Sequence, residues 1–275
     1  MKKKVFLILG LIFAVILGVW GFNNPRNQIQ TSLIAPTPPI SPKPLLTFSV
    51  IGDPESDLDN LKKALAMSKN NGDKFTVLVG DLTHVGAKKE LKEVKQVLDE
   101  SSLKYYAVPG NHDIYSAKKL TGNPTQYFEE IIGSPYGEVL VYIGAALLLI
   151  DNSDEELGIS AKQMEFIKDS LLPDKGHIFI FLHIPVYHPD STYLMGYGNA
   201  YVSKQKDELL NKFHNASVSA FFSGHLHHTS ISEKDNLKFY VAGSVSSQRN
   251  WQTPRFLEVE VFEEGKFSVD EVEVL

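Results

Sequence analysis

Acidic, amide and imidazole side chains follow directly after several apolar segments of the sequence. In chain order they stand in Gly52-Asp53-Pro54-Glu55, Gly80-Asp81, Gly110-Asn111-His112-Asp113, His183 and Gly224-His225-Leu226-His227. Such groups, without thiolates, suit divalent cations such as Mn, Fe, Zn or Mg. A carboxylate can bridge two ions through its two oxygens, and a pair of ions about 3.5–4 Å apart polarises a phosphoryl oxygen. These residue types therefore indicate a metal centre for hydrolysis.

The segments before these residues have the composition of buried β-strands. Short runs of Val, Ile, Leu and Phe that end beside a glycine predict strands. The predicted strands are Leu46–Ile51, Phe75–Val79, Tyr105–Val108, Ala145–Ile150, Ile178–Leu182, Ala220–Phe222, Phe239–Ala242 and Phe256–Phe262. Because the carboxyl ends of parallel strands share one edge of a sheet, residues scattered along the sequence should converge there.

Apolar residues at helical spacing predict helices between these strands. The predicted helices are Leu58–Met67, Lys88–Leu98, Gln126–Ile132, Ala161–Leu171 and Lys204–Phe213. Strands that alternate with helices indicate βαβ units, whereas the last strands follow one another without clear helices and indicate a mixed or antiparallel portion. The order of elements predicts an α/β sandwich.

The order of the motifs resembles that of the calcineurin-like metallophosphoesterases. The signature of that family reads D-x-H, G-D with a variable continuation, G-N-H-D/E, H and G-H-x-H. The resemblance covers residues Leu46 to Ala242, and the last three motifs match fully. It implies an αββα sandwich of mixed β-sheets and a cofactor of two divalent metal ions.

The resemblance also implies a role for each matching residue. One metal would be held by Asp53, Asp81 and His227, and the other by Asp81, Asn111, His183 and His225. His112 would contact the substrate phosphate and protonate or stabilise the leaving oxygen, while Asp113 would orient His112. The implied reaction is hydrolysis of a phosphate mono- or diester by in-line attack of a hydroxide that bridges the two metals.

The first motif departs from the family pattern, because Glu55 stands where a histidine is expected. Residues two apart in an extended segment point the same way, so Glu55 can still reach the metal near Asp53. Its oxygen and negative charge would favour harder ions such as Mn or Mg. Alternatively, this metal site is weak or empty. The chain would then be a non-catalytic module that binds a phosphorylated ligand or a partner.

Residues 1–44 differ in character from the rest of the chain. Three lysines precede an uncharged apolar run, Val5–Phe22. Helices that span a membrane have roughly 17–25 apolar residues, and this run lies near the lower end of that range. Residues 1–22 therefore predict a single-pass anchor with the catalytic domain outside the cytoplasm, or a signal peptide whose cleavage would release a secreted protein. Prolines between positions 36 and 44 predict an extended linker over residues 23–44. The phosphoesterase domain would occupy residues 45–275.

The composition excludes several other classes of protein. The chain of 275 residues has no cysteine, which rules out disulfides, zinc–thiolate sites and cysteine nucleophiles. The net charge of −6 and the lack of Lys/Arg clusters near the motifs argue against binding to long nucleic acids. A small phosphorylated substrate is therefore the expected partner, besides the membrane. The sequence does not indicate an oligomeric state.

Overall fold

The fold is described from a computed structural model, which describes residues 43–141, 145–171, 177–216, 218–263 and 266–275. The predicted anchor or signal peptide and nearly all of the predicted linker lie outside these residues. Within the described ranges, no helix combines the length and the apolar character that a membrane span requires.

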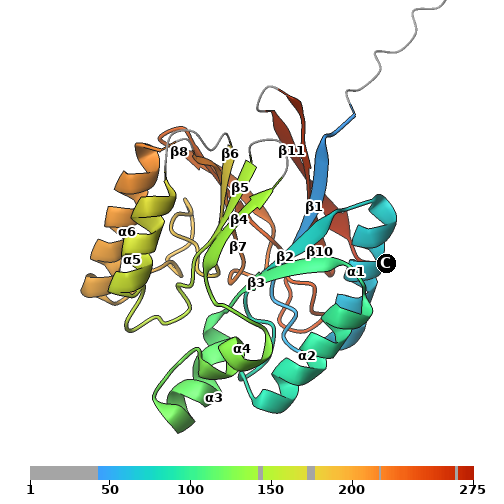
Figure 1. Ribbon diagram of the computed structural model, residues 1–275, viewed down its shortest axis with the longest axis horizontal. Helices are drawn as coiled ribbons and strands as arrows, with labels where there is room; N and C mark the ends of the chain where they lie inside the picture. The colour runs from blue at the N-terminus through green and yellow to red at the C-terminus, as the bar shows by residue number, and fades with distance from the viewer. Residues whose placement is uncertain (1–42, 142–144, 172–176, 217, 264–265) are drawn as a thin grey trace, which may run out of the picture. The chain divides into compact units, whose positions relative to one another are not determined.

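Two mixed β-sheets form the centre of the domain (Figure 1). The first sheet has, in spatial order, β11 (Phe267–Glu273), β10 (Arg255–Val261), β1 (Leu46–Ile51), β2 (Phe75–Val79) and β3 (Lys104–Val108). The second has β4 (Gly137–Val141), β5 (Ala145–Leu149), β6 (His177–Phe181), β7 (Val218–Ser223), β9 (Leu237–Val241) and β8 (Ser230–Lys234). Strands β1 to β3 are parallel to one another, as are β5, β6, β7 and β9. The strands that carry the motifs therefore run in parallel within each sheet.

Helices cover the outer faces of the two sheets. They are α1 (Leu58–Asn71), α2 (Lys88–Glu100), α4 (Gln126–Ile131), α5 (Ala161–Ser170) and α6 (Ala200–His214), while α3 (Asn111–Thr121) packs against α4. Along β2, Val77 and Val79 belong to the core between the sheets, whereas Leu78 belongs to the core that includes buried residues of α1, α2 and α4. Helices α5 and α6 contribute to a third core on the second sheet (Figure 1). The domain is an αββα sandwich.

Aromatic side chains fill the space between the two sheets. Phe48 of β1 is fully buried and stacks on Phe75 of β2, with ring centroids 4.9 Å apart. Across the interface, its ring meets those of Phe181 and Phe222 edge-on at 6.1 and 6.5 Å. Aromatic pairs of this kind bury a large apolar area and prefer defined geometries. They therefore hold the motif-bearing strands of the two sheets in a fixed relation.

The structure confirms the predicted α/β architecture with mixed sheets. All the predicted strands and helices are present, although their ends differ by up to four residues. Helix α3 and strands β4, β8 and β11 were not among the predicted elements. The motifs also follow strands of two sheets, so the side chains converge where the carboxyl ends of both sheets meet, and not along a single edge.

Candidate metal centre

The loops after β1, β2 and β7 have unusual backbone conformations. Asp53, Asp81, His225 and His227 have positive φ angles of 49°, 49°, 70° and 55°. Such conformations are uncommon for residues other than glycine, and they cluster at functional sites where the surrounding structure enforces them. Here Ser244 Oγ donates a hydrogen bond of 2.7 Å to the backbone carbonyl of Asp53. The loops are thus held in turns that direct the acidic and imidazole groups towards one another.

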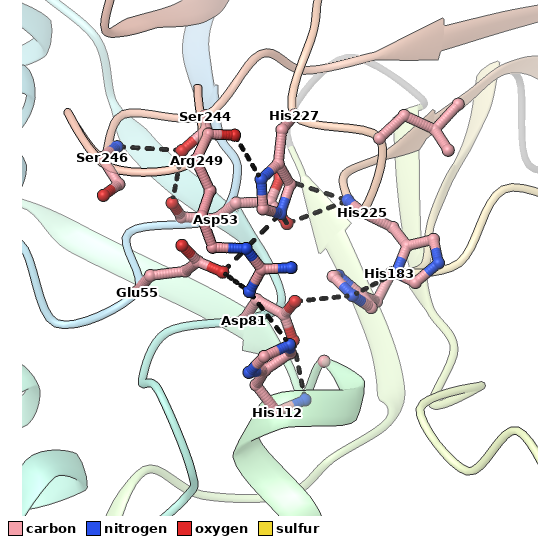
Figure 2. Close-up of polar contacts among 12 residues, drawn as sticks. Asp53, Glu55, Asp81, His112, His183, His225, His227, Ser244, Ser246 and Arg249 are labelled. Atoms are coloured by element: carbon pink, nitrogen blue, oxygen red, sulfur yellow. Dashed lines mark hydrogen bonds and ion pairs between the residues drawn. The ribbon is translucent and has the colours of Figure 1, made fainter. Parts of the chain in front are cut away.

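Asp81, Asn111, His183 and His225 converge on one position. His183 Nε2 lies 3.0 Å from Asn111 Oδ1, 3.3 Å from Asp81 Oδ2 and 3.2 Å from His225 Nδ1. His225 Nδ1 is also 3.2 Å from Asn111 Oδ1. Figure 2 shows His183 and Asp81 pointing towards each other, with His225 beside His183. These four residues are the set that the family resemblance implies for the second metal.

Backbone groups fix the orientation of His183. Its Nδ1 lies 2.8 Å from the carbonyl oxygen of Val79 and donates to it, which leaves Nε2 free to act as a ligand. The buried Asn152 side chain accepts hydrogen bonds of 3.1 Å from the N–H groups of His183 and Ile184, and donates one of 2.6 Å to the Ile184 carbonyl. Partners of this kind orient the ligands of metal sites. No sequence motif pointed to this role for Asn152.

A second group of side chains surrounds Asp53. His227 Nε2 lies 3.7 Å from Asp53 Oδ1 and 3.8 Å from Glu55 Oε1. Ligand atoms of Asp53, Asp81 and His227 all lie within 4.8 Å of one another, and the same holds for Glu55, Asp81 and His112. Asp81 belongs to both groups and also to the group with His183 and His225. Asp81 is therefore the candidate ligand that all three groups share.

The chemistry of the donors fits the implied metals. The Glu55 side chain is buried, and its Oε1 accepts a hydrogen bond of 2.8 Å from Arg249 Nη1. Its Oε2 is buried and has no hydrogen-bond partner among the described residues. A buried carboxylate oxygen without a hydrogen-bond partner lowers the stability of the fold. A cation bound by this carboxylate would reduce that loss. Carboxylate, imidazole and amide donors without thiolates suit hard or borderline divalent ions.

His112 and Asp113 lie at the start of α3 but have different surroundings. The His112 ring contacts the backbone carbonyl of His84 through Nδ1, at 2.7 Å. The buried Asp113 carboxylate accepts hydrogen bonds of 2.9 to 3.0 Å from the N–H groups of Gly110, Leu82 and Thr83. The resemblance implied that Asp113 orients His112. In the described structure Asp113 instead ties the loop after β2 to the start of α3, and the carbonyl of His84 in that loop orients the ring.

Burial and neighbouring charges shift the pKa values at the centre in opposite directions. Burial raises the pKa of Asp53 to about 6, and likewise that of Asp113. Burial would also raise the pKa of Asp81, but the His183 imidazolium lowers it well below its usual range. Asp81 in turn outweighs the effect of burial on His183, whose pKa is raised to about 9. Without metal, the centre therefore holds a proton on His183, which a bound cation would displace.

Two glycines allow the close approach of the metal-binding loops. A Cβ atom at Gly110 would lie 2.1 Å from both the backbone nitrogen and Oδ1 of Asp81. Gly80 has a φ of +86°, and a Cβ there would lie 2.5 Å from His183 Nδ1. The two positions thus require a residue without a side chain.

The fold and the residues at this centre agree with comparisons to known proteins. The calcineurin-like phosphoesterase family matches residues 46–229 of this chain. The match covers more than half of the sequence, and the chain belongs to this family. The resemblance in its motifs is thereby confirmed.

The relatives found among curated proteins have names of hydrolases, in agreement with the predicted class of enzyme. The serine/threonine-protein phosphatase CPPED1 of Rattus norvegicus is 27% identical over 203 residues, which cover 64% of this chain and 60% of the relative. The probable glycerophosphodiester phosphodiesterase GpdQ of Arcobacter nitrofigilis is 25% identical over 180 residues, covering 63% of this chain and 64% of the relative. The match thus spans less than two thirds of the length of these relatives.

Solved structures share the fold at low sequence identity. GAP50, described as the anchor in the inner membrane complex of Plasmodium, has a TM-score of 0.58 at 18% identity, and the match covers 83% of this chain and 84% of that one. The purple acid phosphatase PPD1 of Lupinus luteus has a TM-score of 0.54 at 11% identity, over 83% of this chain and 51% of that one. At these identities the likeness defines the fold and not the activity.

Proposed function

We propose that this chain is a metal-dependent phosphoesterase that hydrolyses phosphate mono- or diesters at a dinuclear centre. The observation that carries the proposal is the position of Asp81, which belongs to three groups of candidate ligands. Within each group, the ligand atoms lie within 4.8 Å of one another. A carboxylate that is shared between neighbouring groups of ligands is suited to bridge two cations.

The two cations would be divided between these groups. Asp53, Asp81 and His227, with Glu55, would hold one, and Asp81, Asn111, His183 and His225 would hold the other. When bound, two divalent ions of Mn, Fe, Zn or Mg supply Lewis acidity towards the phosphoryl group and lower the pKa of the attacking water. The chain itself contributes rigidity, because its buried ligands are fixed by Asn152 and by the carbonyls of Val79 and Arg249.

His112 would act on the leaving oxygen of the substrate. Its Nδ1 is fixed by the His84 carbonyl at 2.7 Å, so Nε2 is the ring nitrogen available to a substrate. The backbone N–H of His112 donates to Asp81 Oδ1 at 2.9 Å, which fixes the start of α3 relative to the centre. Asp113 supports the same loops through its hydrogen bonds to backbone N–H groups. It is therefore a positioning residue.

The alternative is a non-catalytic module with a degraded first metal site. The observation that favours it is the ion pair of 2.8 Å between Arg249 and Glu55, in which a guanidinium neutralises part of the charge that a cation would meet. The position of Glu55 supports the enzyme instead, since its Oε1 lies 3.8 Å from His227 Nε2 and the residue groups with Asp81 and His112.

Metal content and turnover of the full chain, purified in mild detergent, test the proposal together. Elemental analysis should give two divalent ions per chain. The hydrolysis of p-nitrophenyl phosphate or bis-p-nitrophenyl phosphate should depend on added Mn, Mg, Zn or Fe. One ion or none, with no turnover under any metal, would support the binding module and contradict the enzyme.

The location of the domain outside the cytoplasm remains a prediction from residues 1–22, which lie outside the described residues. Protease added to intact cells should digest the catalytic domain if this prediction holds. Protection of the domain until the cells are lysed would contradict it.

A further inference from the structure

Arg249 lies at the solvent-facing side of the candidate metal centre, although it belongs to no motif. Its Nη1 is 2.8 Å from Glu55 Oε1 and 3.4 Å from His112 Nε2. Figure 2 shows the guanidinium between Glu55 and His112, beside Asp81. The Arg249 side chain is 59% exposed, whereas that of Glu55 is fully buried. A positive charge therefore stands at the exposed side of the carboxylates and beside the proposed acid.

The loop that carries Arg249 is anchored at several points. Asn250 Nδ2 donates to the carbonyls of Ser244 and Ser246 at 2.8 and 2.9 Å. The N–H and Oγ of Ser247 donate to Asp57 Oδ2, at the start of α1, at 2.9 and 2.8 Å. Arg249 itself has a φ of 52°, which a residue other than glycine adopts only when its surroundings enforce it. The loop thus places this side chain at a defined position.

Glu55 links Arg249 to the metal centre through Oε1. This oxygen accepts from the guanidinium at 2.8 Å and lies 3.8 Å from His227 Nε2. The histidine that the family pattern has at this position would offer one ring nitrogen to a metal and no second acceptor to an arginine. The departure in the first motif and the presence of Arg249 therefore form one arrangement.

We propose that Arg249 binds the phosphate group of the substrate and makes the centre prefer phosphate monoester dianions to diesters. This inference rests on the proposed phosphoesterase function. The net charge of the centre would be +1 with two divalent cations, a neutral attacking water and the carboxylates of Asp53, Glu55 and Asp81. Arg249 adds a second positive charge. A monoester dianion matches that charge and offers terminal oxygens to the guanidinium fork. A diester carries one negative charge and has an ester arm in place of one of these oxygens.

Substitution of Arg249 in the full chain tests the preference. Arg249→Met removes the charge but keeps the length of the stem and the backbone carbonyl that His227 uses. Loss of one preorganised donor to a phosphoryl group commonly lowers turnover about 100-fold or more, and exposure reduces the effect here. We expect kcat/KM for p-nitrophenyl phosphate to fall roughly 10- to 100-fold, while that for bis-p-nitrophenyl phosphate changes by less than about threefold. Arg249→Lys, which keeps the charge, should lie between the wild type and Arg249→Met.

Two further measurements separate substrate binding from a structural role. Inorganic phosphate should inhibit Arg249→Met more weakly than the wild type, and the metal content by elemental analysis should be the same in both. Gln248→Ala is the matched control, because it removes the neighbouring exposed side chain of the same loop and should change neither substrate's kinetics.

The outcomes distinguish this inference from the proposed function. An equal loss on both substrates, an unchanged ratio between them, or a loss of metal in Arg249→Met would overturn the role of Arg249 while leaving the phosphoesterase in place. No turnover of either substrate by the wild type under any metal would overturn the proposed function, and this inference with it.

Discussion

Replacement of Asn152 by alanine should weaken metal binding although Asn152 touches no metal. The side chain is 1% exposed and makes hydrogen bonds to the N–H groups of His183 and Ile184 and to the Ile184 carbonyl. Alanine would leave these three backbone groups without their partner in a buried site. The strand end that carries His183 would then lose the contacts that fix its backbone.

The size of the effect follows from the number of hydrogen bonds. Each unsatisfied buried group costs about 1–3 kcal/mol, and water entering the space offsets part of this. We expect a loss of about 2–4 kcal/mol in the free energy of unfolding. Loss of a residue that orients a metal ligand commonly lowers metal affinity 10- to 100-fold, and we expect a decrease in that range for Asn152→Ala.

Competition with a fluorescent chelator measures the metal affinity of folded protein, and thermal unfolding measures stability separately. Asn215→Ala is the matched control, since Asn215 caps the end of α6 and its side chain donates to the Asn211 carbonyl at an exposed position. If Asn152→Ala protein is less stable but binds metal as tightly as the wild type, the link between Asn152 and metal binding is refuted. That result would mean that Asn152 supports the fold without orienting His183.

Three other substitutions test separate parts of the account. His112→Gln should lower kcat about 100- to 10,000-fold, as expected for loss of a general acid, while elemental analysis still finds the wild-type metal content; an unchanged kcat would remove His112 from the reaction. Gly110→Ala should abolish metal binding, because its Cβ would lie 2.1 Å from Asp81 Oδ1. Gly122→Ala is the control, because a Cβ there would meet nothing within 4 Å. It should lower the free energy of unfolding by only about 1 kcal/mol, because of the positive φ, and leave metal binding unchanged. Burial raises the pKa of Asp73 from 3.8 to about 6, so the folded state binds this proton more tightly than the unfolded state, and stability should fall as the pH rises from about 4 through 6. Asp73→Asn should remove that pH dependence. With a discount for solvent screening, it should raise the free energy of unfolding at pH 8 by about 1 kcal/mol, or the Tm by roughly 2–4 °C. A Tm no higher than that of the wild type at pH 8 would contradict the raised pKa of Asp73.

The sequence predicted the strands, and the candidate ligands that follow them, because both leave local signals. The strands β1, β2 and β6 are mostly buried and rich in apolar residues, and each ends two residues before a residue that can ligate a metal. Edge strands lack this signal. Strand β8, Ser-Ile-Ser-Glu-Lys, is mostly exposed and polar. Helix α3 begins with the motif residues Asn111-His112-Asp113, which carry no apolar helical spacing.

The remaining features of the site depend on contacts between distant residues. Arg249 reaches Glu55 across 194 positions, and Asn152 holds His183 across 31 positions. His84 acts through its backbone carbonyl, which no side-chain pattern reveals. Spacing in one sequence identifies residues that share a motif, but it does not identify partners that the fold alone brings together.

Elemental analysis of the Asp81→Ala chain beside the wild type is the direct test of whether Asp81 bridges two cations. Because Asp81 lies in all three groups of ligand atoms, the account predicts two divalent ions in the wild type and loss of metal from folded Asp81→Ala protein, with activity abolished. An Asp81→Ala chain that keeps two ions and its turnover would contradict the dinuclear centre proposed here.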